Sequence, residues 1–159
     1  MSDITKRSKE FIKRSVFKFD LETTEVMIIW SLRHWMECSY TKENAKDLFS
    51  LCIEQHGLPD ISVLFEEITT AIKEGSLEKG VIGSEFCNHI HYGELKCLEA
   101  LYFLQNDNIN AAQISLASWL KPEESRVTFK IMMALALILE KSDLIIPSRK
   151  EYQSQWRPH

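Results

Sequence analysis

Apolar residues recur along most of the chain three or four positions apart, the spacing that places them on one side of an α-helix. Stretches in which apolar and polar residues alternate, as in a half-buried strand, are scarce. The pattern predicts helices over residues 1–18, 20–38, 41–56, 60–74, 93–105, 108–120 and 123–140. The expected fold is therefore all-α: a single-domain bundle of six or seven antiparallel-packed helices over residues 1–159, with a short extended segment near 81–91.

The apolar faces also predict which residues form the core. The first two turns of helix 20–38 carry apolar side chains on more than one side, so we expect this helix to be central. Residues in the middle of an apolar face, and two tryptophans near such faces, should be buried: Leu32, Phe65, Leu116, Leu135, Trp35 and Trp119. The same periodicity places Val127 on the buried face of the last long helix.

Two stretches interrupt the helical pattern. Four of the five glycines fall within residues 75–93, which we interpret as a glycine-rich loop between two groups of helices. The periodicity is lost again in residues 143–159, so an irregular tail is predicted there. Trp156, within this tail, either packs back onto the body or is available to a partner.

Charge is distributed unevenly, although the composition is that of an ordinary globular protein, 45% hydrophobic and 26% charged. Residues 1–18 hold six basic and two acidic side chains, so this segment carries +4 while the whole chain carries −4. We interpret it as a basic amphipathic first helix docked on an acidic body. The alternative is that this helix binds nucleic acid nonspecifically or lies on a membrane surface.

The cysteines and the chain start bear on location. The sequence begins MSDITKRSKEFIKRS, which lacks the apolar core of a secretory signal, so the four cysteines are expected to be reduced in a cytoplasmic protein. The longest nearly uncharged run, residues 131–139, is far shorter than the ~20 residues that a membrane helix needs. No transmembrane segment is predicted, and the sequence leaves the oligomeric state open.

The sequence FCNHIHYGELKC, residues 86–97, is the strongest chemical signal. In an extended segment Cys87, His89 and His91 would point to the same side, and sulfur and imidazole are the ligands that zinc prefers. The fourth ligand would be Cys97, Glu94 or water. The spacing departs from the paired knuckles of common zinc sites, so the alternative is that the cysteines are buried apolar residues and the histidines cap the next helix or face solvent.

A second polar cluster, SLRHWMEC, interrupts the apolar helix 20–38. In an enzyme, His34 would serve as a base oriented by Glu37. The simpler interpretation is that Arg33, His34 and Glu37 mark the solvent-exposed edge of a mostly buried helix. The rings of Trp30 and His34, four residues apart, are expected to meet. The chain contains no phosphate-binding loop, dinucleotide-binding glycine motif, nucleophile elbow or HExxH helix.

These observations favour a non-catalytic helical protein-interaction or adaptor module, with a protein as its partner and with no catalytic residues assigned. The predicted partner-binding residues are His89, His91, Tyr92 and Trp156, because mobile loops on rigid helices are common sites of recognition. One alternative is a small zinc enzyme or metal-stabilised domain centred on residues 87–97, whose cofactor would be zinc, whereas the interaction module needs no cofactor. The other is nucleic-acid or membrane-surface binding through residues 1–18.

Overall fold

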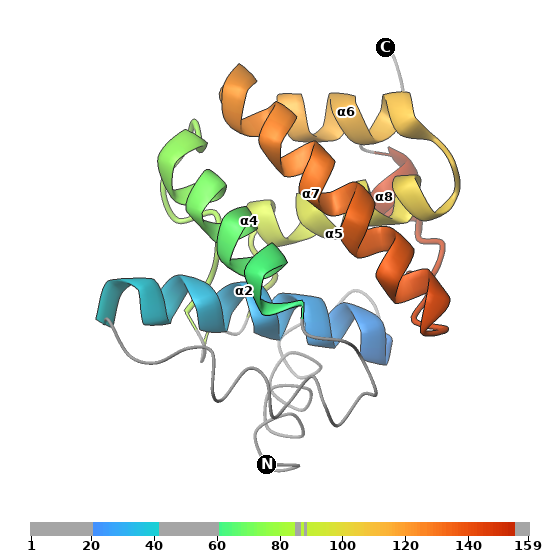
Figure 1. Ribbon diagram of the computed structural model, residues 1–159, viewed down its shortest axis with the longest axis horizontal. Helices are drawn as coiled ribbons and strands as arrows, with labels where there is room; N and C mark the ends of the chain where they lie inside the picture. The colour runs from blue at the N-terminus through green and yellow to red at the C-terminus, as the bar shows by residue number, and fades with distance from the viewer. Residues whose placement is uncertain (1–20, 42–60, 85–86, 88, 155–159) are drawn as a thin grey trace.

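The computed structural model describes residues 21–41, 61–84, 87 and 89–154 (Figure 1). Within these ranges the chain forms helices and no β-strand, which confirms the predicted all-α class. The helices are α2 (Thr23–Thr41), α4 (Ser62–Gly75), α5 (Tyr92–Gln105), α6 (Ile109–Ala117), α7 (Pro122–Lys141) and α8 (Lys150–Ser154). Two predicted helices, over 1–18 and 41–56, and Trp156, a predicted partner-binding residue, lie outside the described residues.

Helices α2 and α5 form the inside of the molecule. Every residue of α2 from Thr24 to Met36 is buried. This agrees with the prediction that the helix is central, but it includes Arg33 and His34, which were expected at an exposed edge. Helix α5 packs against α2, α6, α7 and α8, and α4 packs against both α2 and α7 (Figure 1). In the parts of the chain that the structure describes, no helix combines the length and the apolar character needed to cross a bilayer.

The predicted core residues lie in the core. Leu32, Phe65, Leu116, Leu135, Trp35 and Trp119 are all buried, none of them more than 9% exposed. The buried face of α7 differs from the prediction, because Val127 is 45% exposed while Thr128 is buried. Helix α7 carries apolar residues on several sides, so its periodicity alone did not determine which side packs against α4 and α5.

The end of α4 is joined to the turn between α6 and α7 by backbone hydrogen bonds. Ser76 forms an isolated antiparallel bridge with Leu120. The Leu77 N–H donates to the carbonyl of Trp119 at 3.0 Å, and the Lys121 N–H donates to the carbonyl of Gly75 at 2.8 Å. From this junction the chain continues to α5 as an irregular loop, and the described residues of 81–91 form no strand.

The C-terminal segment is docked on the body. Gln105 of α5 donates to the carbonyl of Leu144 at 3.1 Å and accepts the N–H of Ile146 at 2.8 Å. The tail predicted to be irregular from residue 143 then forms the short helix α8, whose Tyr152 is fully buried. Polar contacts with α5 and burial of an aromatic ring thus hold a segment that lacks a helical pattern of its own.

A buried ion pair completes this docking. Arg149 donates from Nε and Nη2 to the two carboxylate oxygens of Glu25, each at 2.6 Å, and the hydroxyl of Tyr152 donates to the same carboxylate. Glu25 lies in the first turn of α2 and also accepts the N–H of Glu22 at 2.9 Å. The carboxylate therefore caps its own helix while it holds the C-terminal segment.

Candidate functional site

A second buried ion pair joins the middle of α2 to the start of α5. The guanidinium of Arg33 donates from Nε to Glu94 Oε2 at 2.6 Å and from Nη2 to Oε1 at 2.9 Å. The side chains of Arg33 and Glu94 are 2% and 0% exposed. The two parallel bonds form the bidentate geometry in which arginine binds carboxylates most strongly.

The loop between α4 and α5 completes the hydrogen bonding of this carboxylate. Oε2 of Glu94 also accepts the N–H of Gly83 at 2.9 Å, and Oε1 accepts the N–H of His91 at 2.8 Å. Each oxygen therefore accepts two hydrogen bonds, which is about the full capacity of a carboxylate. A buried charge is tolerated only when it is paired and hydrogen-bonded. The N–H groups of the loop therefore stabilise the buried Arg33–Glu94 pair, and the pair in turn holds the loop in place.

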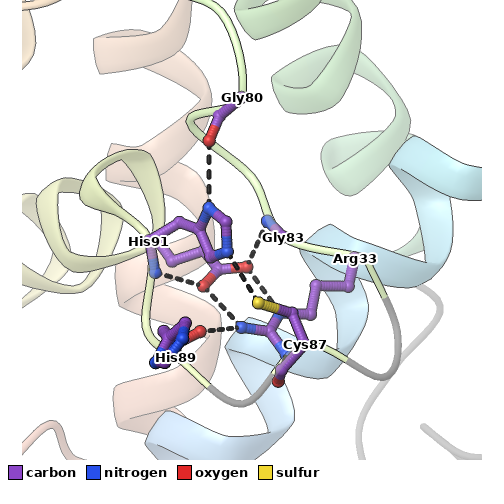
Figure 2. Close-up of polar contacts among 7 residues, drawn as sticks. Arg33, Gly80, Gly83, Cys87, His89 and His91 are labelled. Atoms are coloured by element: carbon purple, nitrogen blue, oxygen red, sulfur yellow. Dashed lines mark hydrogen bonds and ion pairs between the residues drawn. The ribbon is translucent and has the colours of Figure 1, made fainter.

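Arg33 also determines the path of the loop. Its Nη1 donates to the carbonyl of Cys87 at 3.0 Å, and its Nη2 donates to the carbonyl of His89. In Figure 2 the carbonyl of His89 is directed at the guanidinium. One buried arginine thus holds the backbone at both Cys87 and His89.

Two glycines of the loop have different roles here. A Cβ atom on Gly83 would lie 2.8 Å from Cδ2 of His91 and 3.0 Å from Nη2 of Arg33, so a glycine permits this close approach. Gly80 has a φ of +70°, in the left-handed region that favours glycine, and its carbonyl faces His91. One glycine is therefore required for space and the other for backbone conformation.

The side chains of Cys87 and His91 meet beside this scaffold. The Cys87 sulfur lies 2.9 Å from Nε2 of His91, and Nδ1 of His91 lies 3.0 Å from the carbonyl oxygen of Gly80 (Figure 2). A carbonyl oxygen only accepts hydrogen bonds, so Nδ1 carries a proton and Nε2 is directed at the sulfur. The pair is then either a thiol that donates to a neutral imidazole or a thiolate that accepts from an imidazolium.

The surroundings favour the charged form of this pair. Burial alone would raise the pKa of Cys87, but the hydrogen bonds with the His91 side chain and the His89 backbone, together with nearby positive charge, leave that pKa below its ordinary value. Burial opposes protonation of His91, but the hydrogen bond to Cys87 and the carbonyl of Gly80 raise its pKa overall. Both shifts stabilise a thiolate next to an imidazolium.

The three predicted zinc ligands are only partly brought together. Cys87 and His91 are in contact, whereas His89 is exposed and contributes its backbone carbonyl to Arg33. Cys97 is fully buried in α5, where burial raises the pKa of its thiol, and Glu94 is bound to Arg33. Among the described residues no group of three His, Cys, Asp or Glu side chains is placed to hold a metal ion. The zinc hypothesis stays a prediction that these residues do not support.

The other sequence-derived assignments near this loop can now be located. His91 occupies the N-cap position of α5, but its ring nitrogens contact Cys87 and Gly80, and the Glu94 side chain accepts the His91 N–H instead. His89 and Tyr92 are exposed, His91 is half-buried, and their role in partner binding stays a prediction.

The interpretation of Arg33 and His34 as an exposed edge is wrong. They are only 2% and 4% exposed, while Glu37 alone of that cluster is exposed. The rings of Trp30 and His34 are stacked with centroids 5.0 Å apart, as predicted. The role of Arg33 was missed because its partner Glu94 is 61 residues away in sequence. The available signal was an arginine inside an otherwise apolar helix, which is costly to bury unless it is paired.

A separate surface feature lies between α4 and α7, which run side by side (Figure 1). It is a groove of about 680 Å³ with apolar side chains, among them Val63 and Val127, which are 55% and 45% exposed. Its described lining residues also include five glutamates and a single lysine: Glu66, Glu67, Glu74, Glu123, Glu124 and Lys130. The groove is therefore apolar and strongly acidic at the same time.

No family model, no curated protein and no solved structure matches this chain. The function is therefore argued from the groove and from the loop alone.

Proposed function

We propose that this protein is a helical protein-interaction module that binds a basic amphipathic helix in the groove between α4 and α7. The observation that carries this proposal is the exposure of Val63 and Val127 within a groove lined by glutamates. An amphipathic helix that docks in a groove inserts apolar anchors and leaves its polar face at the rim. A partner with apolar anchors and lysine or arginine beside them complements both properties of this groove.

The apolar side chains supply affinity in this proposal. Ile131 and Ala71 also line the groove and are nearly buried, at 9% and 5% exposed, so the apolar surface continues from the core to Val63 and Val127. Fully covering a valine side chain contributes about 1.5 kcal/mol or more, and covering these half-exposed residues contributes part of that. A partner helix that covers both valines removes their apolar surface from water, and this contributes to the free energy of binding.

The glutamates supply selectivity. The described lining residues carry five carboxylates against the ammonium of Lys130, so an acidic helix meets repulsion at the rim while a basic one is attracted. Such attraction between exposed charges increases the association rate and weakens as ionic strength rises. The proposal therefore predicts salt-sensitive binding of basic helices and no binding of acidic ones.

The experiment measures binding of two synthetic peptides to the full chain by fluorescence anisotropy. Each peptide is about 16 residues long, roughly four helical turns, with leucine three and four positions apart; lysine fills the other positions in one peptide and glutamate in the second. The lysine peptide should bind with an affinity that falls as salt is added. The glutamate peptide should not bind.

Matched variants distinguish the groove from general attraction to an acidic protein. The double variant Val63→Ser/Val127→Ser keeps every charge of the groove and should weaken binding of the lysine peptide markedly. The control is Ile114→Ser, since Ile114 is on α6, is 56% exposed and is not a lining residue of the groove. Equal binding by the double variant and the unchanged protein would show that the groove is not the docking site.

A further inference from the structure

Cys87, His91 and Gly80 have the arrangement of an activated nucleophile. The sulfur lies 2.9 Å from Nε2 of His91, and the carbonyl of Gly80, 3.0 Å from Nδ1, fixes the direction of the imidazole. A nucleophile, a base in contact with it and a third group that orients the base are the recurring parts of covalent catalysis. The Cys87–His91 contact is therefore fixed by the loop backbone, because the Gly80 carbonyl holds the imidazole in the orientation that places Nε2 next to the sulfur.

The scaffold also fixes the nucleophile from its own backbone. Arg33 Nη1 binds the carbonyl of Cys87 at 3.0 Å, and the guanidinium is itself held by the buried carboxylate of Glu94. The charged groups that act on the thiol are thus Arg33 of α2 and His91, which directly precedes α5. The pKa of Cys87 is lowered by this environment despite the opposing effect of burial.

Neither of the other described cysteines combines a close histidine contact with exposure to solvent. Cys38 lies 3.8 Å from Nε2 of His34 but is only 7% exposed. Cys97 is 0% exposed, and burial raises its pKa. Cys87 is half-buried, so part of this residue reaches solvent. None of the three is in a disulfide, so they provide an internal comparison within one chain.

We propose that Cys87 is a site of oxidation by hydroperoxides, with His91 as the proton donor. The Cys87 sulfur attacks the terminal oxygen of the peroxide, so that an S–O bond forms and the O–O bond breaks. The Nε2 proton of His91 passes to the departing oxygen. The sulfur loses two electrons and the peroxide gains two, which gives a sulfenic acid at Cys87, an alcohol (water, when the oxidant is hydrogen peroxide) and a neutral imidazole.

Peroxide reduction fits this site better than acyl transfer does. It requires a thiolate and a proton for the departing oxygen, and the Cys87–His91 pair supplies both. Acyl transfer also requires hydrogen-bond donors for an oxyanion. The N–H groups of Arg33 beside Cys87 are already bound to carbonyl oxygens and to Glu94, so they are not available to an oxyanion.

The sulfenic acid at Cys87 would be reduced by an external small thiol. Cys38 and Cys97 are buried, so the described part of the chain offers no accessible thiol that could form a disulfide with Cys87.

The first experiment follows iodoacetamide alkylation of each cysteine in the full chain by peptide mass spectrometry across a range of pH. Cys87 should react faster than Cys38 and Cys97, and its rate should rise with pH around a midpoint below the ordinary thiol pKa of 9.0. A midpoint at or above that value would overturn the proposal. This result does not depend on whether any variant folds.

The variant His91→Gln tests the role of the imidazolium, and His89→Gln is its matched control because His89 is exposed nearby in the same loop. At neutral pH the His91→Gln change should slow alkylation of Cys87 about tenfold, and the two rates should converge at alkaline pH, where any thiol is ionised. The His89→Gln protein should behave like the unchanged one. A rate and pH profile unaffected by His91→Gln would overturn the assignment.

The second experiment tests the product. The full chain is treated with hydrogen peroxide in the presence of dimedone, which traps sulfenic acids, and the adducts are located by mass spectrometry. The adduct should form at Cys87 before any other cysteine and should be absent in Cys87→Ser. Earlier modification of Cys38 or Cys97 would contradict the proposal. So would one equivalent of zinc that is retained through purification and protects Cys87 until a chelator removes it.

Discussion

Helix α2 contributes to two buried arginine–glutamate pairs, and the two differ in what they organise. In one pair α2 supplies Arg33, and the carboxylate of Glu94 comes from α5; in the other α2 supplies Glu25, and Arg149 comes from the C-terminal segment. Both carboxylates are 0% exposed and fully hydrogen-bonded. The chemistry is the same, so the difference in role must come from the remaining partners.

The remaining partners of the Glu25–Arg149 pair are buried and unreactive, whereas those of the Arg33–Glu94 pair belong to a loop that carries a reactive cysteine. The Glu25 carboxylate is completed by the hydroxyl of Tyr152, a fully buried side chain whose pKa is raised by burial and by the charge of Glu25. The Glu94 carboxylate is completed by backbone N–H groups of a loop that carries the half-buried Cys87. The first arrangement is a structural anchor, and the second is the support of a chemical site.

The largest expected effect is on stability when Glu94 is changed to Gln. This substitution leaves the guanidinium of Arg33 buried without a counter-charge, which should lower the free energy of unfolding by about 3 to 5 kcal/mol. Urea denaturation followed by circular dichroism measures the change. The double variant Arg33→Met/Glu94→Leu should recover much of the loss, because it removes both charges. A loss below about 1 kcal/mol in Glu94→Gln would show that the pair is not the support described here.

Changing Glu25 to Gln should cost less, about 2 kcal/mol. The side chain of Arg149 is 11% exposed whereas that of Arg33 is 2% exposed, so the unpaired guanidinium of Arg149 can regain part of its hydration. The same denaturation measurement compares the two variants directly. A larger loss for Glu25→Gln than for Glu94→Gln would reverse the proposed order of the two pairs.

The variant Tyr152→Phe should lower the free energy of unfolding by about 1.5 kcal/mol, because it removes one hydrogen bond to a charged group and keeps the buried ring. Alkylation of Cys87 should be unchanged in this variant but altered in Glu94→Gln. This contrast separates the anchor from the reactive site. A change in Cys87 reactivity in Tyr152→Phe would show that the two regions are coupled.

The sequence predicted the parts of the molecule that follow from local periodicity. The apolar spacing correctly located α2, α4, α5, α6 and α7, since each buries a continuous face. It did not predict α8, which has five residues, too few to show a helical period, and which is held through a contact between Tyr152 and Glu25, 127 residues apart. Helix periodicity carries no information about such distant partners.

For the candidate site, too, the sequence identified the chemical groups but did not predict the contacts that depend on a distant residue. The cysteine and histidines of residues 87–91 stood out by residue type, and Cys87 and His91 do meet. The expectation that their side chains would point the same way rested on an extended backbone. The backbone carbonyls of Cys87 and His89 instead both accept hydrogen bonds from Arg33. Arg33 belongs to another helix, so this arrangement was not visible in the loop sequence.

The smallest effect is the pH dependence of stability that the Cys87–His91 pair contributes. The folded-state pKa of His91 is raised, so its contribution is fully present below the ordinary value of 6.5 and is lost as pH rises through the folded-state pKa. The folded-state pKa of Cys87 is lowered, so its contribution is present above the ordinary value of 9.0 and is lost as pH falls through the folded-state pKa. The two contributions therefore depend on pH in opposite directions: the stabilisation from His91 decreases as pH rises above 6.5, and that from Cys87 increases as pH rises toward 9.0. Subtracting the unfolding free energy of Cys87→Ser/His91→Gln from that of the unchanged protein at each pH should give a difference that decreases above pH 6.5 and increases again toward pH 9.0. A difference that does not change with pH over this range would show that the folded protein shifts the pKa of neither group.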